Sequence, residues 1–383
     1  MKLTVGISVY DKIEELQILI SILEKISFVK EIYVATTCER EEVITQLKKL
    51  PITKLVKINI PLVKVDKVKF HFSLTARIVE SQRSLVKLWL KEGDSKFYIH
   101  THSDGWILSA YKLLQLLKAI EAKNITFAFR GTGLGYRYIP GAPLGELDDH
   151  FYVFKRADNL LNLPMMKIDF RFFPLHILNI HGFWAAFAVL NIGLNKLWHY
   201  SNGLKWKAWD GKVLDNTYGM PLKPFVWDED WALLHIHRES FPEDWGRSLQ
   251  AYFLANFLEK SLISPTVEAF IDKYFDKRII EKISDQERKL TRRLKFFLLS
   301  PKLFHRDLNV MQKVYNKIRK GDVKTLIYYH IKQTMPYIEK LLKPRRYFLK
   351  DFYSEYPKNF KDYLESLLQI IEKNLEGNRD AIK

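Results

Sequence analysis

Segments with the character of buried strands alternate with amphipathic helices from residue 2 to residue 100. The expected strands cover residues 2–10, 31–36, 55–63 and 96–100, and the expected helices cover residues 13–26, 39–50 and 74–91. Strands separated by helices of this length form βαβ units, whose strands run parallel within one sheet. The sequence therefore predicts an α/β, Rossmann-like fold with a mainly parallel sheet flanked by helices.

The second half of the chain continues the alternation and then becomes helical. Helices are expected at residues 106–122 and 248–259, and strands at 125–130, 151–154 and 232–237. Beyond residue 261 the pattern is almost purely helical, which indicates an α-helical C-terminal extension. We therefore expect a domain at residues 1–260, with halves at 1–105 and 106–260, and an extension at 261–383.

Composition narrows the class of protein. Hydrophobic residues make up 47% of the chain and aromatic residues 14%, which is typical of a globular core and excludes a disordered chain. The formal net charge is +17, and residues 261–383 hold 27 Lys and Arg against 16 Asp and Glu, a net of +11. This excess predicts an anionic partner: nucleotide phosphate, nucleic acid or a lipid headgroup surface.

The location is expected to be cytoplasmic. Cys38 is the only cysteine, which excludes an intrachain disulfide and fits a reducing compartment. No secretory signal is visible at the start of the sequence, and the most apolar window, residues 183–194, is too short to span a bilayer. The Lys, Glu and Ile usage, with few Gln residues, favours a thermophilic source.

The segment Phe-Tyr-Ile-His-Thr-His-Ser-Asp-Gly, residues 97–105, is the main site candidate. It reads as the fourth strand followed directly by metal-ligand residue types. Ligands of open α/β sheets bind outside the carboxyl ends of the strands. His102 and Asp104 alternate there, so both side chains are expected to turn toward one ligand.

The order of these elements, together with the triplet His102-Ser103-Asp104, resembles the nucleotide-binding half of a GT-A glycosyltransferase of the large inverting type. That family ends its fourth strand with a D-x-D triplet. Thr75-Ala76-Arg77 resembles the stretch that the family places on the preceding helix, and residues 234–238 resemble its late histidine-bearing strand. The resemblance covers residues 1–260, so that residues 1–105 become the nucleotide-binding half and 106–260 the acceptor half.

The resemblance implies a nucleotide site and a metal. Ser8, Tyr10 and Arg77 would line the nucleotide pocket, and Asp104, aided by His102, would hold the donor diphosphate through Mn²⁺ or Mg²⁺. His102 stands where the family has its first carboxylate, which favours Mn²⁺ or a softer ion over Mg²⁺. The family's acidic residue after the second strand is missing from residues 35–38, and Glu39 is the nearest substitute.

The resemblance also implies the remaining catalytic groups. His235 or His237 would approach the leaving group or the metal. Asp149, beside Asp148, would be the general base that takes the proton of the acceptor hydroxyl. The acidic run at residues 228–230 is the alternative source of that base.

The expected partners are a nucleotide-sugar donor and a glycan, lipid-linked or protein acceptor, with nucleic acid disfavoured. Basic residues lie next to aromatic residues at 288–297 and 343–350, which suits peripheral contact with the inner membrane face. A solvated face on a helical appendage explains the same pattern.

Two other functions stay open. His100 and His102 share one strand face and resemble the first motif of metal phosphoesterases of the polymerase and histidinol-phosphatase type. A non-catalytic sugar-binding or nucleic-acid-binding protein would keep the sheet without the first carboxylate. His100 also fits a core histidine that hydrogen-bonds its neighbours, and Asp104-Gly105 fits an ordinary turn.

Overall fold

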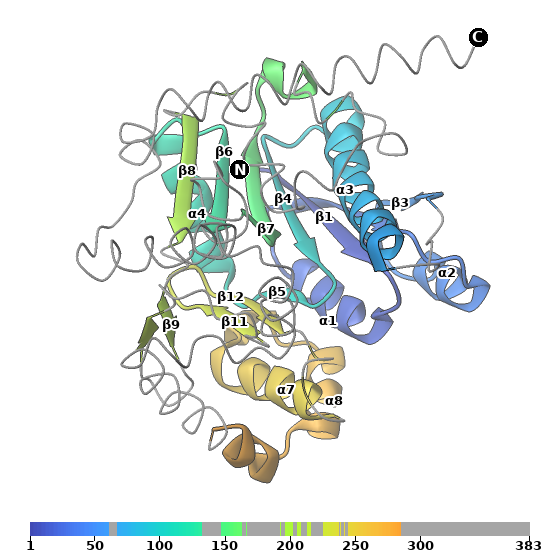
Figure 1. Cartoon of the computed structure of the whole chain (residues 1–383). Helices are drawn as coiled ribbons and strands as arrows, with labels where there is room; N and C mark the ends of the chain where they lie inside the picture. Colours follow the sequence, from blue (N-terminus) through green and yellow to red (C-terminus); the bar gives the residue numbers. More distant parts are fainter. Residues whose placement is uncertain are drawn as a thin grey trace, which may run out of the picture.

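A computed structural model describes residues 1–60, 67–131, 147–162, 196–201, 205–207, 213–215, 225–236 and 244–284, with single positions at 166, 192, 238 and 241. Its centre is a seven-stranded sheet with the order β3-β2-β1-β4-β7-β6-β8 (Figure 1). The strands are β1 (Leu3–Val9), β2 (Val29–Thr36), β3 (Lys54–Lys57), β4 (Phe97–His102), β6 (Phe127–Gly131), β7 (Leu147–Lys155) and β8 (Leu197–Ser201). Strand β7 is antiparallel to its neighbours, and all other neighbouring pairs are parallel. The predicted mainly parallel α/β sheet is therefore confirmed.

Helices cover both faces of this sheet. They are α1 (Ile13–Leu23), α2 (Glu41–Lys48), α3 (Lys67–Glu92) and α4 (Ala110–Ala122). Val5 of β1 belongs to the main hydrophobic core, which α1, α2 and α4 share. The next residue, Gly6, points the other way and lies against Tyr98 of β4, whose ring stacks on Trp89 of α3. Since strand side chains alternate, α3 covers one face and the other three helices cover the opposite face.

A smaller antiparallel sheet of three strands stands next to the carboxyl end of β4. Its strands are β5 (Gly105–Ile107), β12 (Leu233–Ile236) and β11 (Phe225–Asp228). The sequence predicts a helix that begins at residue 106, and this start is wrong. Helix α4 begins only at Ala110, with Ser109 as its N-cap. Three residues are too short to show a strand period, and their partner β12 is remote in sequence.

Strand β7 is longer than the sequence pattern indicates. A strand is expected at residues 151–154, whereas β7 begins at Leu147. Asp148 and Asp149 therefore lie inside its first residues rather than in a turn before it. Pairing with β6, which reaches Gly131↔Leu147, extends the strand into this polar stretch, whereas the pairing with β4 runs from Phe97↔Lys155 to Thr101↔Phe151.

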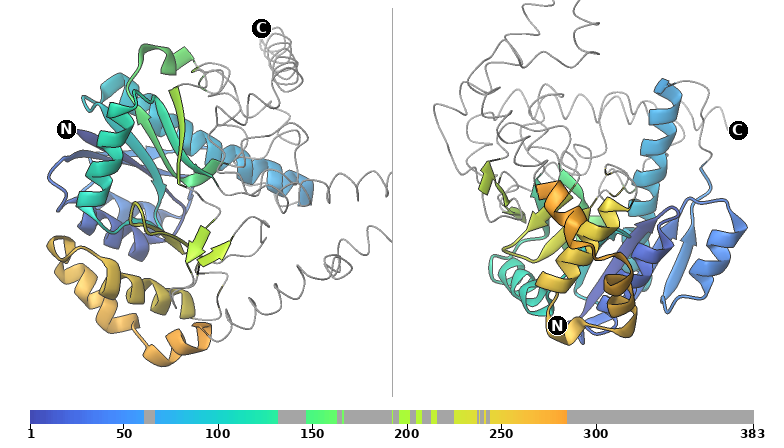
Figure 2. Two further views of the ribbon diagram at one scale, coloured as in Figure 1. Left: turned by 90° about the vertical axis from the view of Figure 1, so that its left-hand side faces the viewer. Right: turned by 90° about the horizontal axis from the view of Figure 1, so that it is seen from below.

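Two of the last described helices pack around α1. They are α7 (Trp245–Phe257) and α8 (Pro265–Tyr274), which lie beyond β5 and β12 in Figure 1 and beside α1 in Figure 2. Val267 and Phe270 of α8 belong to the same hydrophobic core as β1, and the Phe270 ring meets Trp106 edge-on at 5.8 Å. The predicted helical extension is described only as far as residue 284. Among the described residues, no helix is long and apolar enough to cross a bilayer.

Candidate functional site

The candidate site lies at the carboxyl ends of β1 and β4. These strands are parallel neighbours, and Ser8 of β1 pairs in register with His102 of β4. The backbone N–H of Ser103 donates to the carbonyl oxygen of Ser8 at 3.1 Å, so the turn after β4 stays attached to β1. The structure therefore brings Ser8, His102 and Asp104 to one edge of the sheet, as their positions in the sequence predict.

The turn after His102 is held in one shape by its own hydrogen bonds. Thr101 Oγ1 donates to the carbonyl oxygen of Gly105 at 2.9 Å, and Trp106 Nε1 donates to that of Ser103 at 3.1 Å. A Cβ at Gly105 would come within 2.4 Å of Thr101 Oγ1. The absence of a side chain at this position therefore permits the close approach that aims Asp104 into the site.

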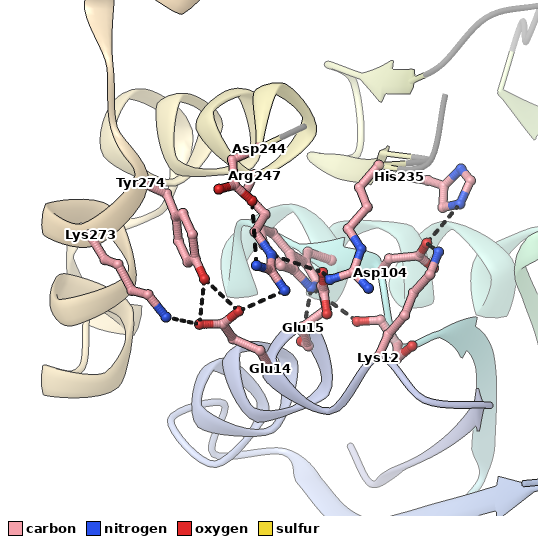
Figure 3. Close-up of polar contacts among 12 residues, drawn as sticks. Lys12, Glu14, Glu15, Asp104, His235, Asp244, Arg247, Lys273 and Tyr274 are labelled. Atoms are coloured by element: carbon pink, nitrogen blue, oxygen red, sulfur yellow. Dashed lines mark hydrogen bonds and ion pairs between the residues drawn. The ribbon is translucent and has the colours of Figure 1, made fainter. Parts of the chain in front are cut away.

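Asp104 is a buried carboxylate surrounded by cations (Figure 3). Its Oδ2 lies 2.6 Å from Lys12 Nζ and 3.7 Å from His235 Nε2. Burial alone would raise the pKa of Asp104, but the charges of His235, Lys12 and His102 together hold that pKa well below its usual 3.8. Asp104 is therefore ionised at neutral pH, with its charge largely balanced.

Lys12 is positioned by the first turn of α1, which a second ion pair anchors. Glu15, in that turn, is fully buried, and burial raises the pKa of its carboxyl group. Arg238 Nη1 donates to Glu15 Oε1 at 2.6 Å, and Arg247 Nε lies 3.9 Å from the same oxygen. Figure 3 shows Arg247 of α7 next to Glu15 of α1, beside the Lys12–Asp104 pair. The start of α1 is therefore fixed relative to the turn that carries Asp104.

Three histidine rings from three strands form a row beside Asp104. The ring centroids of His102 and His150 are 4.6 Å apart, and those of His150 and His235 are 3.5 Å apart with the rings stacked. His150 is a residue that sequence reasoning missed as a site residue. The signal that identifies it is the register of β7 on β4, because Thr101↔Phe151 puts the next residue of each strand side by side. Sequence alone does not give that register.

His100 belongs to the core behind this row. It is fully buried, and its ring stacks on Tyr152 at a centroid distance of 4.8 Å. Its Nε2 lies 3.4 Å from Ser8 Oγ and its Nδ1 lies 3.3 Å from the Tyr98 hydroxyl. Both ring nitrogens thus face hydroxyl groups, which favours a hydrogen-bonded core histidine over one of the paired metal ligands of a phosphoesterase.

A second group of side chains lies at the ends of β1 and β2. The buried Arg77 of α3 donates to the carbonyl oxygen of Thr37, just after β2. Its guanidinium carbon lies 5.3 Å from the centre of the Tyr10 ring, and that of Arg40 lies 5.9 Å from it. Tyr10 is 46% exposed, so part of its side chain is accessible to a ligand, and two guanidinium groups lie over its ring. The expected nucleotide-pocket residues Tyr10 and Arg77 therefore meet next to the Asp104 turn.

The structure describes other predicted residues only in part, or outside the group around Asp104. The backbone of Asp148 and Asp149 enters β7 directly before His150, but their side chains lie outside the described residues, as does His237. Asp228 sits at the β11–β12 turn, where its Oδ1 accepts from the N–H of Trp231 at 3.3 Å, whereas His235 pairs with Gly105 further along β12.

The described residues do not fit a divalent metal in their present arrangement. One carboxylate and several imidazoles are chemically suited to Mn²⁺ or a softer ion. However, in the part of the chain that the structure describes, no three His, Cys, Asp or Glu side chains are placed to hold one ion. Asp104 is bonded to Lys12 instead, and His150 presents its ring face, not a nitrogen, to His235.

No protein-family model matches the chain, and no curated protein matches its sequence. Solved structures that resemble it include a CMP:2-keto-3-deoxy-manno-octonic acid synthetase in complex with CTP, with 15% identity and a TM-score of 0.26 over 43% of this chain and 79% of that one. A mannosyltransferase from Pyrobaculum calidifontis in complex with GDP-Man and Mn²⁺ gives 9% identity and a TM-score of 0.32 over 50% of this chain and 52% of that one. A 4-diphosphocytidyl-2C-methyl-D-erythritol synthase gives 11% identity and a TM-score of 0.27 over 40% of this chain and 75% of that one. With TM-scores below 0.5, these likenesses carry no functional argument.

Proposed function

We propose that this protein transfers a sugar from a nucleotide-sugar donor to a hydroxyl acceptor. The observation that carries the proposal is the gathering of two kinds of surface at the carboxyl ends of β2, β1 and β4. Tyr10 and Arg77 offer an aromatic and cationic surface, and Lys12 with Asp104 offers a charged one beside it. A nucleoside diphosphate needs such a pair of surfaces, one for the nucleoside and one for the phosphates.

The charges at this edge favour an anionic ligand. Three acidic side chains at this edge have a cationic partner; the pairs are Asp11 with Arg40, Glu15 with Arg238, and Asp104 with Lys12. The acids therefore leave little negative charge that would repel phosphate. The guanidinium of Arg77 then adds positive charge, which supports binding of the diphosphate leaving group.

Asp149 is the proposed general base, with Asp148 next to it as the alternative. Inverting transfer needs a carboxylate near the sugar carbon to accept the proton of the acceptor hydroxyl. Both residues enter β7 directly before His150, whose ring contacts those of His102 and His235. No step of this proposal passes through a metal. Assistance by Mn²⁺ or Mg²⁺ remains an expectation from the resemblance.

The acceptor side stays a proposal as well. A glycan, a lipid-linked molecule or a protein would each supply the hydroxyl group. The basic segments expected to meet a membrane, at 288–297 and 343–350, lie outside the described residues. A peripheral position at the inner membrane face therefore rests on the charge and aromatic pattern of the sequence alone.

Calorimetric titration with UDP, GDP, CMP and dTDP, each with Mn²⁺ and with EDTA, tests the proposal. We expect one nucleotide to bind, and the corresponding nucleotide-sugar to release free nucleotide when acceptors are supplied. Tyr10→Ala removes an exposed ring and should weaken binding about tenfold, because base stacking on an aromatic ring contributes ~1–3 kcal/mol. Tyr111→Ala is the matched control, since Tyr111 is a 65% exposed tyrosine on α4.

The other possible results of these titrations distinguish between the alternative functions. Failure of all the nucleotides to bind, with or without metal, would contradict the transferase proposal; metal binding by the protein in that case would favour the phosphoesterase. Nucleotide binding without any release from nucleotide-sugars would favour the non-catalytic binding protein. Equal losses in Tyr10→Ala and Tyr111→Ala would place the nucleotide elsewhere.

A further inference from the structure

Lys12 places a positive charge next to the buried carboxylate of Asp104, although its residue type alone does not mark it as a site residue. It lies between β1 and α1, and its Nζ is 2.6 Å from Asp104 Oδ2. The Lys12 side chain is 17% exposed and that of Asp104 is 5% exposed. The carboxylate is thus buried beneath the ammonium group, and the ammonium group keeps some access to solvent.

A lysine ammonium can contact a carboxylate and a phosphate at the same time. It carries three N–H donors around one compact positive charge, and in this structure it donates to Asp104. A divalent ion in a nucleotide-sugar site does the same two things, since it binds a carboxylate on the protein side and phosphate oxygens on the ligand side. The two cations therefore compete for one position against Asp104.

The neighbouring side chains fit the lysine better than an ion. His235 lies 3.7 Å from the same Asp104 oxygen, and His150 stacks its ring on His235. A metal would need imidazole nitrogens directed at a common point, whereas the ion pair needs only the geometry that is present. His102, which stands in place of the first carboxylate of the resembling family, gives no negative charge to a metal at this edge.

We propose that Lys12 is the cation that holds the donor diphosphate against Asp104, in place of a divalent ion, so that donor binding requires no metal. This inference rests on the proposed function. Lys12 acts as a binding residue in it, and Asp104 positions Lys12. Loss of the Lys12 charge should then do two separate things: weaken binding of the phosphates, and free Asp104 to attract a metal.

The test is calorimetric binding of the nucleoside diphosphate that binds best among UDP, GDP and dTDP, and of the same nucleoside without phosphate. In the native protein, the diphosphate should bind equally well in EDTA and in Mn²⁺. Lys12→Met should weaken diphosphate binding in EDTA about tenfold to a hundredfold, because a hydrogen bond to a charged group contributes ~1.5–3 kcal/mol. Binding of the free nucleoside should not change, and Mn²⁺ should restore part of the lost diphosphate affinity.

Two further variants separate this role from a structural one. Lys25→Met makes the same change at an exposed lysine just beyond the other end of α1, and should leave binding unchanged. Lys12→Met combined with Asp104→Asn removes both charges without leaving a buried one, so it should fold, bind the diphosphate weakly in EDTA and gain nothing from Mn²⁺.

Several outcomes would overturn the inference. If diphosphate binding by the native protein requires Mn²⁺, or if Lys12→Met binds the diphosphate normally in EDTA, Lys12 does not replace the ion. An equal loss of diphosphate and free-nucleoside binding in both Lys12 variants would show a structural role only. These results leave the proposed transferase function intact, whereas binding of no nucleotide under any condition removes both.

Discussion

Asp104 is a carboxylate that this fold can bury only because cations surround it. Taking an ionised group out of water costs several kcal/mol, and partners must offset that cost. His235 at 3.7 Å and Lys12 at 2.6 Å provide this compensation. The same charges hold the pKa of Asp104 below its usual range. Burial of Asp104 therefore lowers the stability of the fold, and its ionised carboxylate can interact with a charged ligand.

Removal of Lys12 should consequently destabilise the protein. In Lys12→Met the carboxylate of Asp104 stays buried without its closest cation, and we expect the free energy of unfolding to fall by about 3 kcal/mol. Adding Asp104→Asn should recover most of that loss, because the uncompensated charge is then gone. Urea denaturation of both variants measures the difference. A double variant no more stable than Lys12→Met would contradict a direct pairing of the two charges.

The sequence identified some of these residues and missed others for a physical reason. Asp104 and His102 could be predicted because a polar pair directly after an apolar strand is conspicuous. Lys12 could not, since a lysine near a helix start is ordinary in a chain that is rich in lysine. His150 depends on which strand lies next to β4 and in which register, and a single sequence carries neither piece of information.

Strand β1 packs closely against β4, and this packing needs a residue without a side chain at position 6. A Cβ at Gly6 would lie 2.0 Å from the hydroxyl oxygen of Tyr98, which is fully buried against Trp89 of α3. The phenol ring cannot retreat without disturbing α3. The pairing of β1 with β4, which brings Ser8 to His102, therefore depends on a glycine at this position.

Gly6→Ala should destabilise the protein by about 2–3 kcal/mol, because overpacking a close-packed core forces side chains or backbone to shift. Tyr98→Leu in the same protein should relieve part of this cost, so the effects of the two changes should not be additive. Chemical denaturation of the single and double variants measures this. Additive losses would show that Gly6 does not act through Tyr98.

Helix α8 is attached to α1 by a polar cluster around Glu14. The Tyr274 hydroxyl donates to Glu14 Oε2 at 2.9 Å, Lys273 Nζ lies 3.0 Å from Oε1, and Arg247 Nη2 lies 3.1 Å from Oε2 (Figure 3). Partial burial raises the pKa of Glu14, but these partners more than offset burial and lower it below 4.5. The ionised form is therefore the one that the folded state favours.

Glu14→Gln should lower stability by about 1 kcal/mol at neutral pH, where the native carboxylate is charged. Because the folded-state pKa is depressed, this contribution is fully present above the unfolded-state pKa of about 4.3. It should be lost as the pH falls through the lower pKa of the folded state. Unfolding experiments on both proteins from pH 7 down to the acid limit follow the difference. A gap that stays constant as pH falls would contradict the depressed pKa.

At the level of elements, hydrophobic periodicity predicts long strands and helices, whereas short strands depend on pairing with other segments that the sequence does not reveal. Strands β1, β2 and β4 and their helices could be predicted because they are long enough to show their period, whereas the strand expected at residues 55–63 already ends at Lys57 and α3 begins at Lys67 rather than at residue 74. Strand β5 could not, because its three residues become a strand only by pairing with β12, more than a hundred residues away. The start of β7 likewise follows from its partner β6, whose Gly131 pairs with Leu147, rather than from its own polar residues.

Taken as a whole, the molecule places its polar chemistry at one edge of a rigid sheet. The carboxyl ends of β1, β2 and β4 present the Tyr10–Arg77 surface and the Lys12–Asp104 pair side by side. The small sheet adds His235 from the other side, and α7 and α8 hold α1 in place beneath it (Figures 1 and 3). Rigid elements that converge in this way suit a site where a charged ligand must be held in one orientation.

The crystal structure of the protein with its best-binding nucleoside diphosphate, grown without divalent metal, tests the central claim most directly. We predict that the base lies against Tyr10 and the phosphates contact Lys12 Nζ beside Asp104. A nucleotide bound away from the carboxyl ends of β1 and β4, or one whose phosphates leave Lys12 and Asp104 untouched, would contradict this account.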